Sequence, residues 1–501
     1  MSTHDLSHWR HQADRLSLTT RPFIDGDFVD SQGDGILTAY NPATGAVLAE
    51  VNACNAADID RAVGAARRVF EGGSWSRCPP LQRKKVLLRF AALIEEHAEE
   101  LALIQTLEMG KPITDSLSFD LAETVRCVAW YAETIDKRYD EIAPTGEDVH
   151  ATISREPLGV VAAVVPWNFP LMIAAWKFAP ALAMGNSVVL KPAEASSLSG
   201  LRLAALAEEA GLPAGVFNVT PGHGAVAGQA LGLHRDVDAL TFTGSTATGK
   251  RFMRYSSESN LKRVWLECGG KSPHIVFADC PDLDAAAQAA AAGIFTNQGE
   301  VCIAGSRLYV DEAIFDTFLP RLLEAAKAMP AGDPLDPATR MGALISAEHH
   351  AKVLDYIERG LSEGMTLHHG GRAATPVDGG WYLEPTILEG AQAAVLMREE
   401  IFGPVLGINR FTSESEAIDL ANDSIYGLGA GLWTSDLARA HRVSRRLSAG
   451  LVWVNCYADG DISVPFGGMK QSGFGRDKSL HALDKYSDLK TTWMNLAYGS
   501  S

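Results

Sequence analysis

The segment "TNQGEVCIAG", residues 296–305, places Cys302 after a glycine-containing turn and beside an amide and a carboxylate. It follows an alanine-rich stretch that is typical of a helix. A thiolate is a strong nucleophile, but a cysteine at an arbitrary position is more often a small buried apolar residue. The chain has seven cysteines, so a catalytic role for this one needs support from other residues.

Two further segments carry side chains that could assist a nucleophile. "WLECGGKSP" places Glu267 between an apolar strand and two glycines, where partial desolvation would raise its pKa and suit a general base. "VVPWNFPL" places Asn168 in a proline-bracketed loop, where a rigid amide could hold an oxyanion. The alternatives are a capping or loop carboxylate and an amide that satisfies backbone groups.

Two other segments carry residues that could bind a nucleotide. "TFTGSTATGK" places Gly244 and Gly249 at a strand-to-helix turn, where the backbone can approach a diphosphate at a helix N-terminus. The segment lacks the G-x-G-x-x-G pattern, so it is a weak signal alone. "VVLKPAE" places Lys191 and Glu194 at the end of another strand, within reach of the same ligand. The alternative is a pair of solvated loop charges.

Apart from Cys302, which follows a helix-like stretch, these residues lie at or near the ends of predicted strands. Apolar strand-like segments alternate with helix-like segments in two stretches of the chain, which predicts parallel sheets and an α/β class. The strand-like segments are 159–165, 185–192, 215–222, 238–245, 263–270, 273–280, 306–310, 405–411 and 450–455. We place the boundary between the two stretches near 266–270. A length of 501 residues also favours two or three domains.

Composition narrows the class of protein. The chain is 47% hydrophobic and 21% charged, as in soluble globular proteins, and its net charge of −17 argues against nucleic-acid binding. The uncharged stretch 159–176 is interrupted by Pro166 and Pro170, so we predict no membrane span. The polar N-terminus shows no secretory signal, and the widely spaced cysteines predict neither disulfides nor a metal site. We therefore expect a cytoplasmic protein.

Two segments fit neither stretch. "GEDVHATISREP" alternates like a two-sided strand, and "YSDLKTTWMNL" is an extended tail. Such segments leave open strand edges unless another subunit pairs with them, so we predict that both serve oligomerisation. The alternative is that they are surface strands of a monomer.

Seven motifs occur in one chain in a fixed order: PWNFP, KPAE, FTGST, LECGGK, NQGEVC, EEIFGPV and PFGGMKQSGFGR. Together they resemble the NAD(P)-dependent aldehyde dehydrogenase superfamily over nearly the whole chain. The resemblance implies a Rossmann-type NAD-binding domain, a separate α/β catalytic domain and a small β oligomerisation arm. We assign these to 1–138 with 159–266, to 267–482, and to 139–158 with 483–501. It also implies a homo-oligomer, a dimer or a tetramer.

The resemblance implies a role for each of the three candidate catalytic residues. Cys302, in the family's N-Q-G-x-x-C motif, would attack the aldehyde carbon. The Asn168 amide and the Cys302 backbone N–H would hold the oxyanion, and Glu267 would activate water to hydrolyse the thioester. The implied cofactor is NAD, because Glu194 on the adenosine ribose would repel the 2′-phosphate of NADP.

The resemblance implies a larger set of cofactor contacts. Lys191 and Glu194 would meet the adenosine ribose, Ser245 the diphosphate, and Glu400 and Phe402 the nicotinamide ribose and ring. The remaining residues of the predicted cofactor site are Val165, Pro166, Trp167, Gly224, Gly228, Phe242 and Gly244.

The substrate is predicted from the same resemblance and from charge. The C-terminal motifs are similar to those of enzymes that oxidise γ-glutamyl-γ-aminobutyraldehyde or 4-guanidinobutyraldehyde in putrescine and arginine breakdown. Asp120 and Glu123 are three residues apart on one predicted helix face, and Asp459 and Asp461 precede PFGG. We expect these acids to attract a cationic aldehyde; the alternative is that they are ordinary surface acids. Met172 and Trp176 would line the apolar middle of the tunnel.

Four rival functions remain. A general aliphatic or aromatic aldehyde dehydrogenase would not depend on the acids. A CoA-acylating relative would usually lack Glu267, and a silent binding protein would have lost Cys302, Glu267 or Asn168. A cofactor-free thiol hydrolase would need a histidine partner for the cysteine, which no motif supplies.

Overall fold

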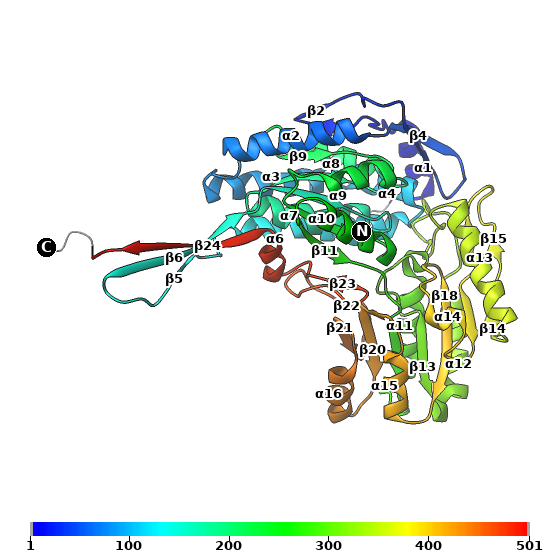
Figure 1. The fold of residues 1–501 in the computed structure, drawn as a ribbon. Coiled ribbons are helices and arrows are strands. Elements are labelled where there is room, and N and C mark those ends of the chain that lie inside the picture. Colours follow the sequence, from blue (N-terminus) through cyan, green and yellow to red (C-terminus); the bar gives the residue numbers. More distant parts are fainter. Residues whose placement is uncertain (1–3, 498–501) are drawn as a thin grey trace.

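The strands predicted before residue 270 pair into one mostly parallel sheet of eight strands (Figure 1). The computed structural model describes residues 4–497. In sheet order the strands are β2 (Asp27–Phe28), β1 (Phe23–Ile24), β9 (Phe217–Val219), β8 (Ser187–Lys191), β7 (Val160–Val164), β10 (Ala239–Thr243), β11 (Arg263–Glu267) and β23 (Gly473–Phe474). β1, β2 and β23 are antiparallel to their neighbours. The carboxyl ends of β7, β8, β10 and β11 therefore lie along one edge.

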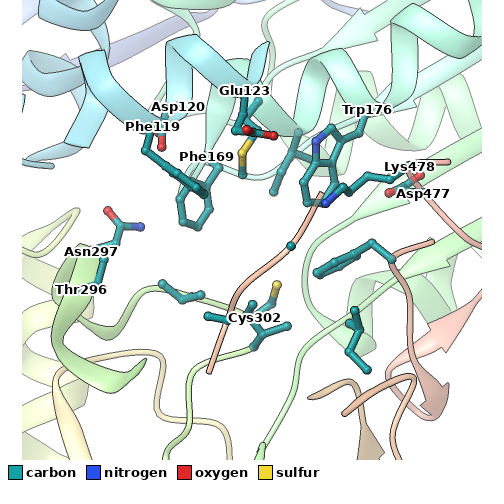
Figure 2. Close-up of a pocket in the computed structure, with 18 of the residues that line it drawn as sticks. Phe119, Asp120, Glu123, Phe169, Trp176, Thr296, Asn297, Cys302, Asp477 and Lys478 are labelled. Carbon is teal, nitrogen blue, oxygen red and sulfur yellow. The ribbon is translucent and has the colours of Figure 1, made fainter. Parts of the chain in front are cut away.

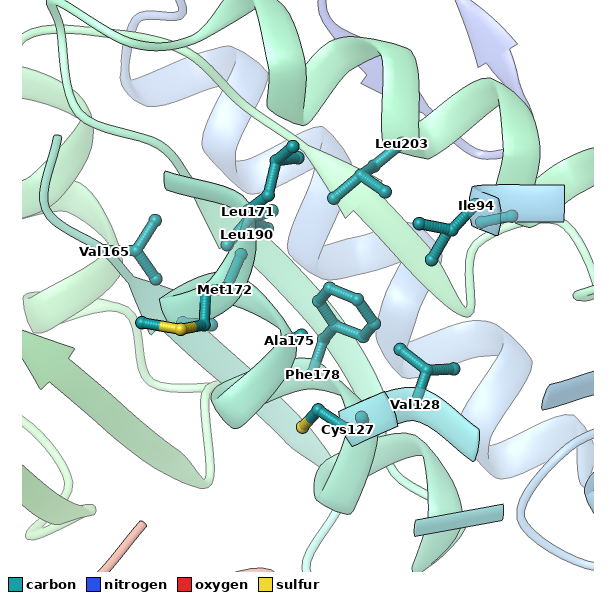
Figure 3. Packing of buried hydrophobic residues seen from close by; sticks show 14 of the residues in the cluster. Ile94, Cys127, Val128, Val165, Leu171, Met172, Ala175, Phe178, Leu190 and Leu203 are labelled. Atoms are coloured by element: carbon teal, nitrogen blue, oxygen red, sulfur yellow. The ribbon is translucent and has the colours of Figure 1, made fainter. Parts of the chain in front are cut away.

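Helices cover both faces of this sheet, which explains why its strands are uninterrupted apolar runs. Val161 and Ala163 of β7 belong to one hydrophobic cluster, and Val160 and Ala162 to another. Figure 3 shows the first cluster, in which Phe178 packs beside Cys127 and Val128. Helices that contribute to it are α3 (Pro80–Glu96), α4 (Ala98–Met109), α6 (Ala122–Thr134), α7 (Pro170–Ala183) and α8 (Leu198–Glu209). Helices on the other face are α2 (Ala56–Gly72), α9 (Gln229–Leu233) and α10 (Thr246–Glu258).

The strands predicted after residue 270 form a second sheet of seven strands. In order they are β14 (Thr366–His369), β17 (Thr386–Glu389), β18 (Val405–Phe411), β13 (Arg307–Asp311), β12 (Pro273–Val276), β20 (Gly429–Trp433) and β21 (Leu451–Val454). Its helices are α11 (Leu283–Phe295), α12 (Phe315–Lys327), α13 (Ala347–Ser362), α14 (Val395–Arg398), α15 (Glu414–Asn422) and α16 (Leu437–Arg446). The α/β class is confirmed, with parallel sheets as predicted.

One short strand crosses the predicted domain boundary. β23 pairs with β11 in the first sheet, although residues 473–474 fall within the predicted catalytic segment 267–482. The pairing registers Gly473 opposite Glu267, so the C-terminal segment is anchored beside a candidate catalytic residue. The division of the chain into domains stays a proposal.

The two segments that fitted neither stretch form a projecting arm (Figure 1). β24 (Ser487–Asn495) pairs antiparallel with β6 (Val149–Pro157), which also pairs with β5 (Glu141–Ile142). Leu489 and Trp493 on β24 are each 64% exposed. The arm therefore presents an apolar strand at an open sheet edge, a surface that isolated proteins rarely leave uncovered.

The remaining elements are short or peripheral. They are α1 (Leu6–Arg15), β3 (Ile36–Tyr40), β4 (Val47–Asn52), α5 (Ile113–Asp115), a π-helical turn over Ser116–Leu121, a second over Gly224–Gly228, 3₁₀ turns over Thr296–Gly299, Glu312–Ile314 and Leu480–Lys485, β15 (Ala373–Ala374), β16 (Tyr382–Leu383), β19 (Tyr426–Gly427) and β22 (Met469–Lys470). Within residues 4–497, no helix is both long and apolar enough to cross a bilayer.

Candidate active site

A cavity of about 440 Å³ lies between α6 and α7 on one side and the loops after β11, α11 and β21 on the other. Cys302, which is labelled in Figure 2, lines it together with Glu267. Its walls are mainly aromatic and aliphatic, with Phe169, Trp176 and Phe466 among the largest side chains. Such a cavity, apolar with a few convergent polar groups, is typical of a small-molecule site.

The loop that carries Cys302 is held in an uncommon backbone conformation. After α11 ends, Asn297 and Gln298 adopt left-handed φ angles of 52° and 56°. The Gln298 side chain stabilises this turn by donating to Ala343 O (3.1 Å) and accepting from Gly342 N (3.0 Å). Strained backbone of this kind costs on the order of 1–3 kcal/mol and persists only where the surroundings enforce it. The turn thus presents Cys302 to the cavity in one arrangement.

The glycines of "LECGG" make room for this loop. A Cβ on Gly270 would lie 2.3 Å from the Cys302 carbonyl oxygen, so only glycine permits the contact. The Gly270 N–H donates to Glu400 Oε1 at 2.9 Å. The two motifs that carry Cys302 and Glu267 therefore pack directly against each other.

The Cys302 thiol is held in its protonated form. Burial raises its pKa to about 12, and the nearby carboxylates of Glu400 and Glu267 act in the same direction. The side chain is only partly buried and faces the cavity. Its reactivity toward a ligand therefore depends on what enters the cavity and changes the local charge.

Asn168 is tied to the cysteine loop. Its Nδ2 donates to Glu300 O at 2.8 Å, and Asn297 Nδ2 donates to both Asn168 O and Glu300 O at 3.2 Å. Within residues 4–497, Glu300 O is the one acceptor recorded for the Asn168 amide, which leaves its second N–H for a ligand. The Cys302 N–H likewise has no backbone acceptor among the described residues.

Glu267 is a buried carboxylate without a partner. It is 4% exposed, and neither of its oxygens has a hydrogen-bond partner within residues 4–497. Burial raises its pKa well above the usual value, and the charge of Asp477 raises it further. A raised pKa strengthens the affinity of the carboxylate for a proton, which suits a general base.

Asp477 stays ionised beside Glu267. Burial alone would raise its pKa, but ion pairs with Lys177 and Lys485 outweigh this and lower it. Asp477 therefore contributes a negative charge that raises the pKa of Glu267 beyond the effect of burial. Sequence patterns did not point to Asp477; its only signal is its place directly after the PFGGMKQSGFGR motif.

The predicted adenosine contacts lie at the carboxyl ends of β8 and β9. The Glu194 carboxylate accepts from the Gly224 N–H at 2.6 Å, and Gly228 packs beside the Lys191 methylenes. Lys191 donates to Pro192 O at 3.1 Å. Burial lowers its pKa to about 8, and Glu194 opposes the shift. A carboxylate and an ammonium at this edge suit the hydroxyls of a ribose.

The predicted diphosphate contacts lie between β10 and α10. Ser245 caps α10 by accepting from the Thr248 N–H at 3.3 Å, so free N–H groups of the first turn face outward. A Cβ on Gly244 would lie 2.5 Å from the Phe242 ring, which explains the glycine. Val165, which donates to Lys191 O (3.1 Å), and Pro166 follow β7 at the same edge.

The predicted nicotinamide contacts surround the cysteine loop. A Cβ on Gly269 would lie 2.0 Å from Glu400 Oε2, so this carboxylate sits directly above the glycine pair. Phe402 has φ 61°, and its ring meets that of Trp167 at 5.3 Å, nearly at right angles. The predicted cofactor residues therefore lie around the carboxyl edge of the first sheet, next to Cys302. Glycines at this edge leave space that larger side chains would fill. They fit a dinucleotide.

The predicted substrate acids divide into two groups. Asp120, Glu123 and Asp459 line the cavity, as do Met172 and Trp176. Asp461 is not among the lining residues and forms an ion pair with Arg126 instead. Asp120 is fully buried and pairs with Lys111 and Gln105, so its charge is compensated.

Sequence reasoning missed the cations of the cavity. Lys111 and Lys478 both line it. Lys111 lies over the Phe169 ring at 3.7 Å and pairs with Asp120, nine residues along the chain. The motif "GRDKSL" contains Lys478, but nothing in the linear sequence indicates that it faces the acids of α6.

With this geometry in place, comparison with known proteins identifies the class. Residues 28–492 match the model of the aldehyde dehydrogenase family, and the chain belongs to that family. It is an oxidoreductase that acts on aldehydes, and structures of homologous enzymes hold NAD+.

Individual relatives match over nearly their whole length. The NADP/NAD-dependent aldehyde dehydrogenase PuuC of Escherichia coli is 55% identical over 99% of this chain and 100% of its own. The structure of γ-glutamyl-γ-aminobutyraldehyde dehydrogenase from Burkholderia cenocepacia is 54% identical, with a TM-score of 0.97, over 98% and 100%. The structure of AldA, an indole-3-acetaldehyde dehydrogenase of P. syringae in complex with NAD+, is 53% identical, with a TM-score of 0.97, over 99% and 100%. The predicted family and branch are confirmed.

Proposed function

We propose that this enzyme oxidises an aldehyde to a carboxylic acid through a covalent intermediate on Cys302. The observation that carries the proposal is the shared cavity of Cys302 and Glu267, with a carboxylate free of protein partners and the Asn168 amide tied to the cysteine loop. A nucleophile and a base in one apolar cavity, with an amide donor bonded to the loop that carries the nucleophile, are the parts that acyl-transfer chemistry requires.

The chain's own groups account for the bond changes. The Cys302 thiol loses its proton to water, and the thiolate sulfur forms a bond to the aldehyde carbon. The C=O π bond breaks, and its oxygen becomes an oxyanion that the Asn168 amide and the Cys302 N–H hold. After oxidation the carbon is a thioester. Glu267 takes a proton from water, whose oxygen bonds to the carbonyl carbon, and the C–S bond breaks to release the acid and the thiolate.

NAD, when bound, supplies the hydride acceptor for the oxidation step. The residues that would hold it lie near the carboxyl edge of the first sheet or, for the last two, in the loop between α14 and β18: Val165, Pro166, Trp167, Lys191, Glu194, Gly224, Gly228, Phe242, Gly244, Ser245, Glu400 and Phe402. Glu194 favours NAD over NADP because its carboxylate would repel a 2′-phosphate.

Rival chemistries fit the cavity less well. Transfer of the acyl group to CoA needs no water-activating base, yet Glu267 lies in the cavity wall with a raised pKa. A cofactor-free thiol hydrolase needs a histidine beside its cysteine, and the described lining residues include none.

For the substrate we propose an ω-amino, guanidino or γ-glutamylamino aldehyde of putrescine or arginine breakdown. Glu123 and Asp459 supply negative charge at the cavity wall, while the charge of Asp120 is compensated and Asp461 lies outside. Met172 and Trp176 would contact the apolar chain of the substrate. The name of the Burkholderia cenocepacia enzyme, γ-glutamyl-γ-aminobutyraldehyde dehydrogenase, supports this class. The alternative is an aryl or aliphatic aldehyde, which the aromatic walls and the name of AldA favour.

Two measurements test these proposals. Mass spectrometry of Glu267→Gln after mixing with NAD and an aldehyde should find the acyl group on Cys302; no adduct would refute the covalent route. The ratio of kcat/KM for 4-guanidinobutyraldehyde to that for an uncharged aldehyde of similar length, in wild type and Glu123→Gln, tests the substrate class. Equal rates in both proteins would favour the general enzyme.

We further propose that the enzyme is a homo-oligomer, a dimer or tetramer, that works in the cytoplasm. The open edge of β24 with exposed Leu489 and Trp493 supports assembly through the arm. Trp493→Asp should lower the mass measured by light scattering; an unchanged mass would refute this role of the arm.

A further inference from the structure

A lysine in the cavity wall has no ionic partner. Lys478 is 8% exposed and lines the cavity, and its ammonium has no hydrogen bond or ion pair with any residue in 4–497. Its one recorded contact is with the face of Trp176, 5.6 Å from Nζ to the ring centroid. Buried lysines are almost always paired, because an isolated ammonium loses its hydration.

The backbone fixes the position of this ammonium. Lys478 has a left-handed φ of 61°, an uncommon and costly conformation for a residue with a side chain. Its neighbours hold it there: Asp477 N donates to Phe466 O and Ser479 N donates to Ile462 O, both at 2.7 Å. A Cβ on Gly460 would lie 3.4 Å from Lys478 Nζ, so the glycine leaves space beside the ammonium.

A carboxylate faces the same cavity. Glu123 on α6 is partly buried and forms one ion pair within residues 4–497, at 3.4 Å with Nη1 of Arg126, whose other terminal nitrogen pairs with Asp461. Glu123 and Lys478 attract each other but are not within ion-pair distance. Figure 2 shows both on the side of the cavity opposite Cys302, with Trp176 between them. Two opposite charges therefore line one cavity without neutralising each other.

We propose that Lys478 and Glu123 bind the two charges of an amino-acid head on the substrate, the carboxylate on Lys478 and the ammonium on Glu123. This inference rests on the proposed aldehyde oxidation at Cys302 and narrows its substrate class. An aldehyde whose far end carries both charges satisfies both residues. A purely cationic aldehyde, such as a guanidino aldehyde, satisfies Glu123 but meets repulsion from Lys478.

Four aldehydes allow the effects of the substrate's carboxylate and ammonium to be measured separately. All are 4-aminobutyraldehyde acylated on nitrogen: by glutamate through its γ-carboxyl, which carries both charges; by glutarate, with the carboxylate alone; by 4-aminobutyrate, with the ammonium alone; and by butyrate, with neither. The chain between the amide and the aldehyde is identical in all four, so differences in kcat/KM report the head alone.

Removing the Lys478 ammonium should lower kcat/KM only for the aldehydes that carry a carboxylate. In Lys478→Met, kcat/KM should fall at least about tenfold, mainly through KM, for the glutamyl and glutaryl aldehydes, the usual effect of a lost charge-assisted bond. The butanoyl and 4-aminobutanoyl aldehydes should not lose rate. Lys478→Arg should retain the preference for the carboxylate, and Lys327→Met, which removes an exposed lysine on α12, should change nothing.

The matching variant is Glu123→Gln, which should lower kcat/KM for the glutamyl and 4-aminobutanoyl aldehydes only. The inference is overturned if Lys478→Met lowers the rates of all four aldehydes by one factor, or if wild type does not prefer a carboxylate. A purely structural lysine would instead lower the Tm when replaced. If wild type oxidises all four equally, only this inference fails; if it oxidises none with NAD, the proposed function fails.

Discussion

Replacing Asn168 with alanine removes a hydrogen-bond donor that is needed only when charge develops on the substrate oxygen. In the free enzyme the side chain makes one recorded bond, from Nδ2 to Glu300 O at 2.8 Å. That carbonyl also accepts from Asn297 Nδ2 at 3.2 Å, so it keeps a partner in the variant. The cysteine loop should therefore hold its shape.

Asn168→Ala should lower both the stability of the protein and its rate of catalysis, but by different amounts. Loss of one buried neutral hydrogen bond should lower the free energy of unfolding by about 1 kcal/mol. Loss of an oxyanion donor should raise the barrier by about 3–4 kcal/mol, which is a fall of roughly 10²–10³-fold in kcat. The effect on rate should thus clearly exceed the effect on stability.

The assay is single-turnover NADH formation at saturating aldehyde, alongside urea unfolding of both proteins. Asn168→Asp is the matched control, because it keeps the shape but places a carboxylate beside the oxyanion, and it should be at least as slow as the alanine variant. A fall in kcat of less than about tenfold in a stably folded Asn168→Ala protein would refute the oxyanion role.

Three further predictions concern the base, the nucleophile and a buried ion pair. Glu267→Gln should give a burst of NADH followed by a stall, seen by stopped-flow absorbance; steady turnover would mean that another group activates water. Because burial raises the pKa of Cys302 to about 12, the rate of its alkylation by iodoacetamide in the cofactor-free enzyme should rise roughly tenfold per pH unit between pH 7 and 10, and a plateau near pH 8 would contradict this. Asp120→Asn should lower the free energy of unfolding by about 3–5 kcal/mol, because it leaves Lys111 buried and unpaired, whereas a loss below 1 kcal/mol in urea would show that the pair is not needed.

Local patterns were sufficient to place the candidate catalytic residues on their elements. The proline-interrupted apolar run predicted a strand, a loop and a helix, and the structure has β7, the loop with Asn168 and α7 in that order. Glu267 ends β11 as predicted, and Cys302 follows α11. These positions depend on neighbours in the chain, which a sequence displays.

The charge of the cavity could not be derived in this way. The spacing of Asp120 and Glu123 predicted that they share one helix face, and both line the cavity. It did not indicate that Lys111 compensates one of them, or that Arg126 engages Asp461, 335 residues away. A charge on a wall is set by every group that folds against it, and those groups come from distant parts of the chain.

The sequence by itself therefore determined the class of the protein, the order of its strands and helices, and the candidate nucleophile, base and oxyanion donor, because each rests on local periodicity or on a contiguous motif. Only the tertiary structure decided which charges remain available to a substrate. It pairs Asp120 with Lys111, adds β23 beside Glu267, and brings Lys478 to face α6 without a partner. These outcomes depend on packing between segments hundreds of residues apart, which no local pattern records.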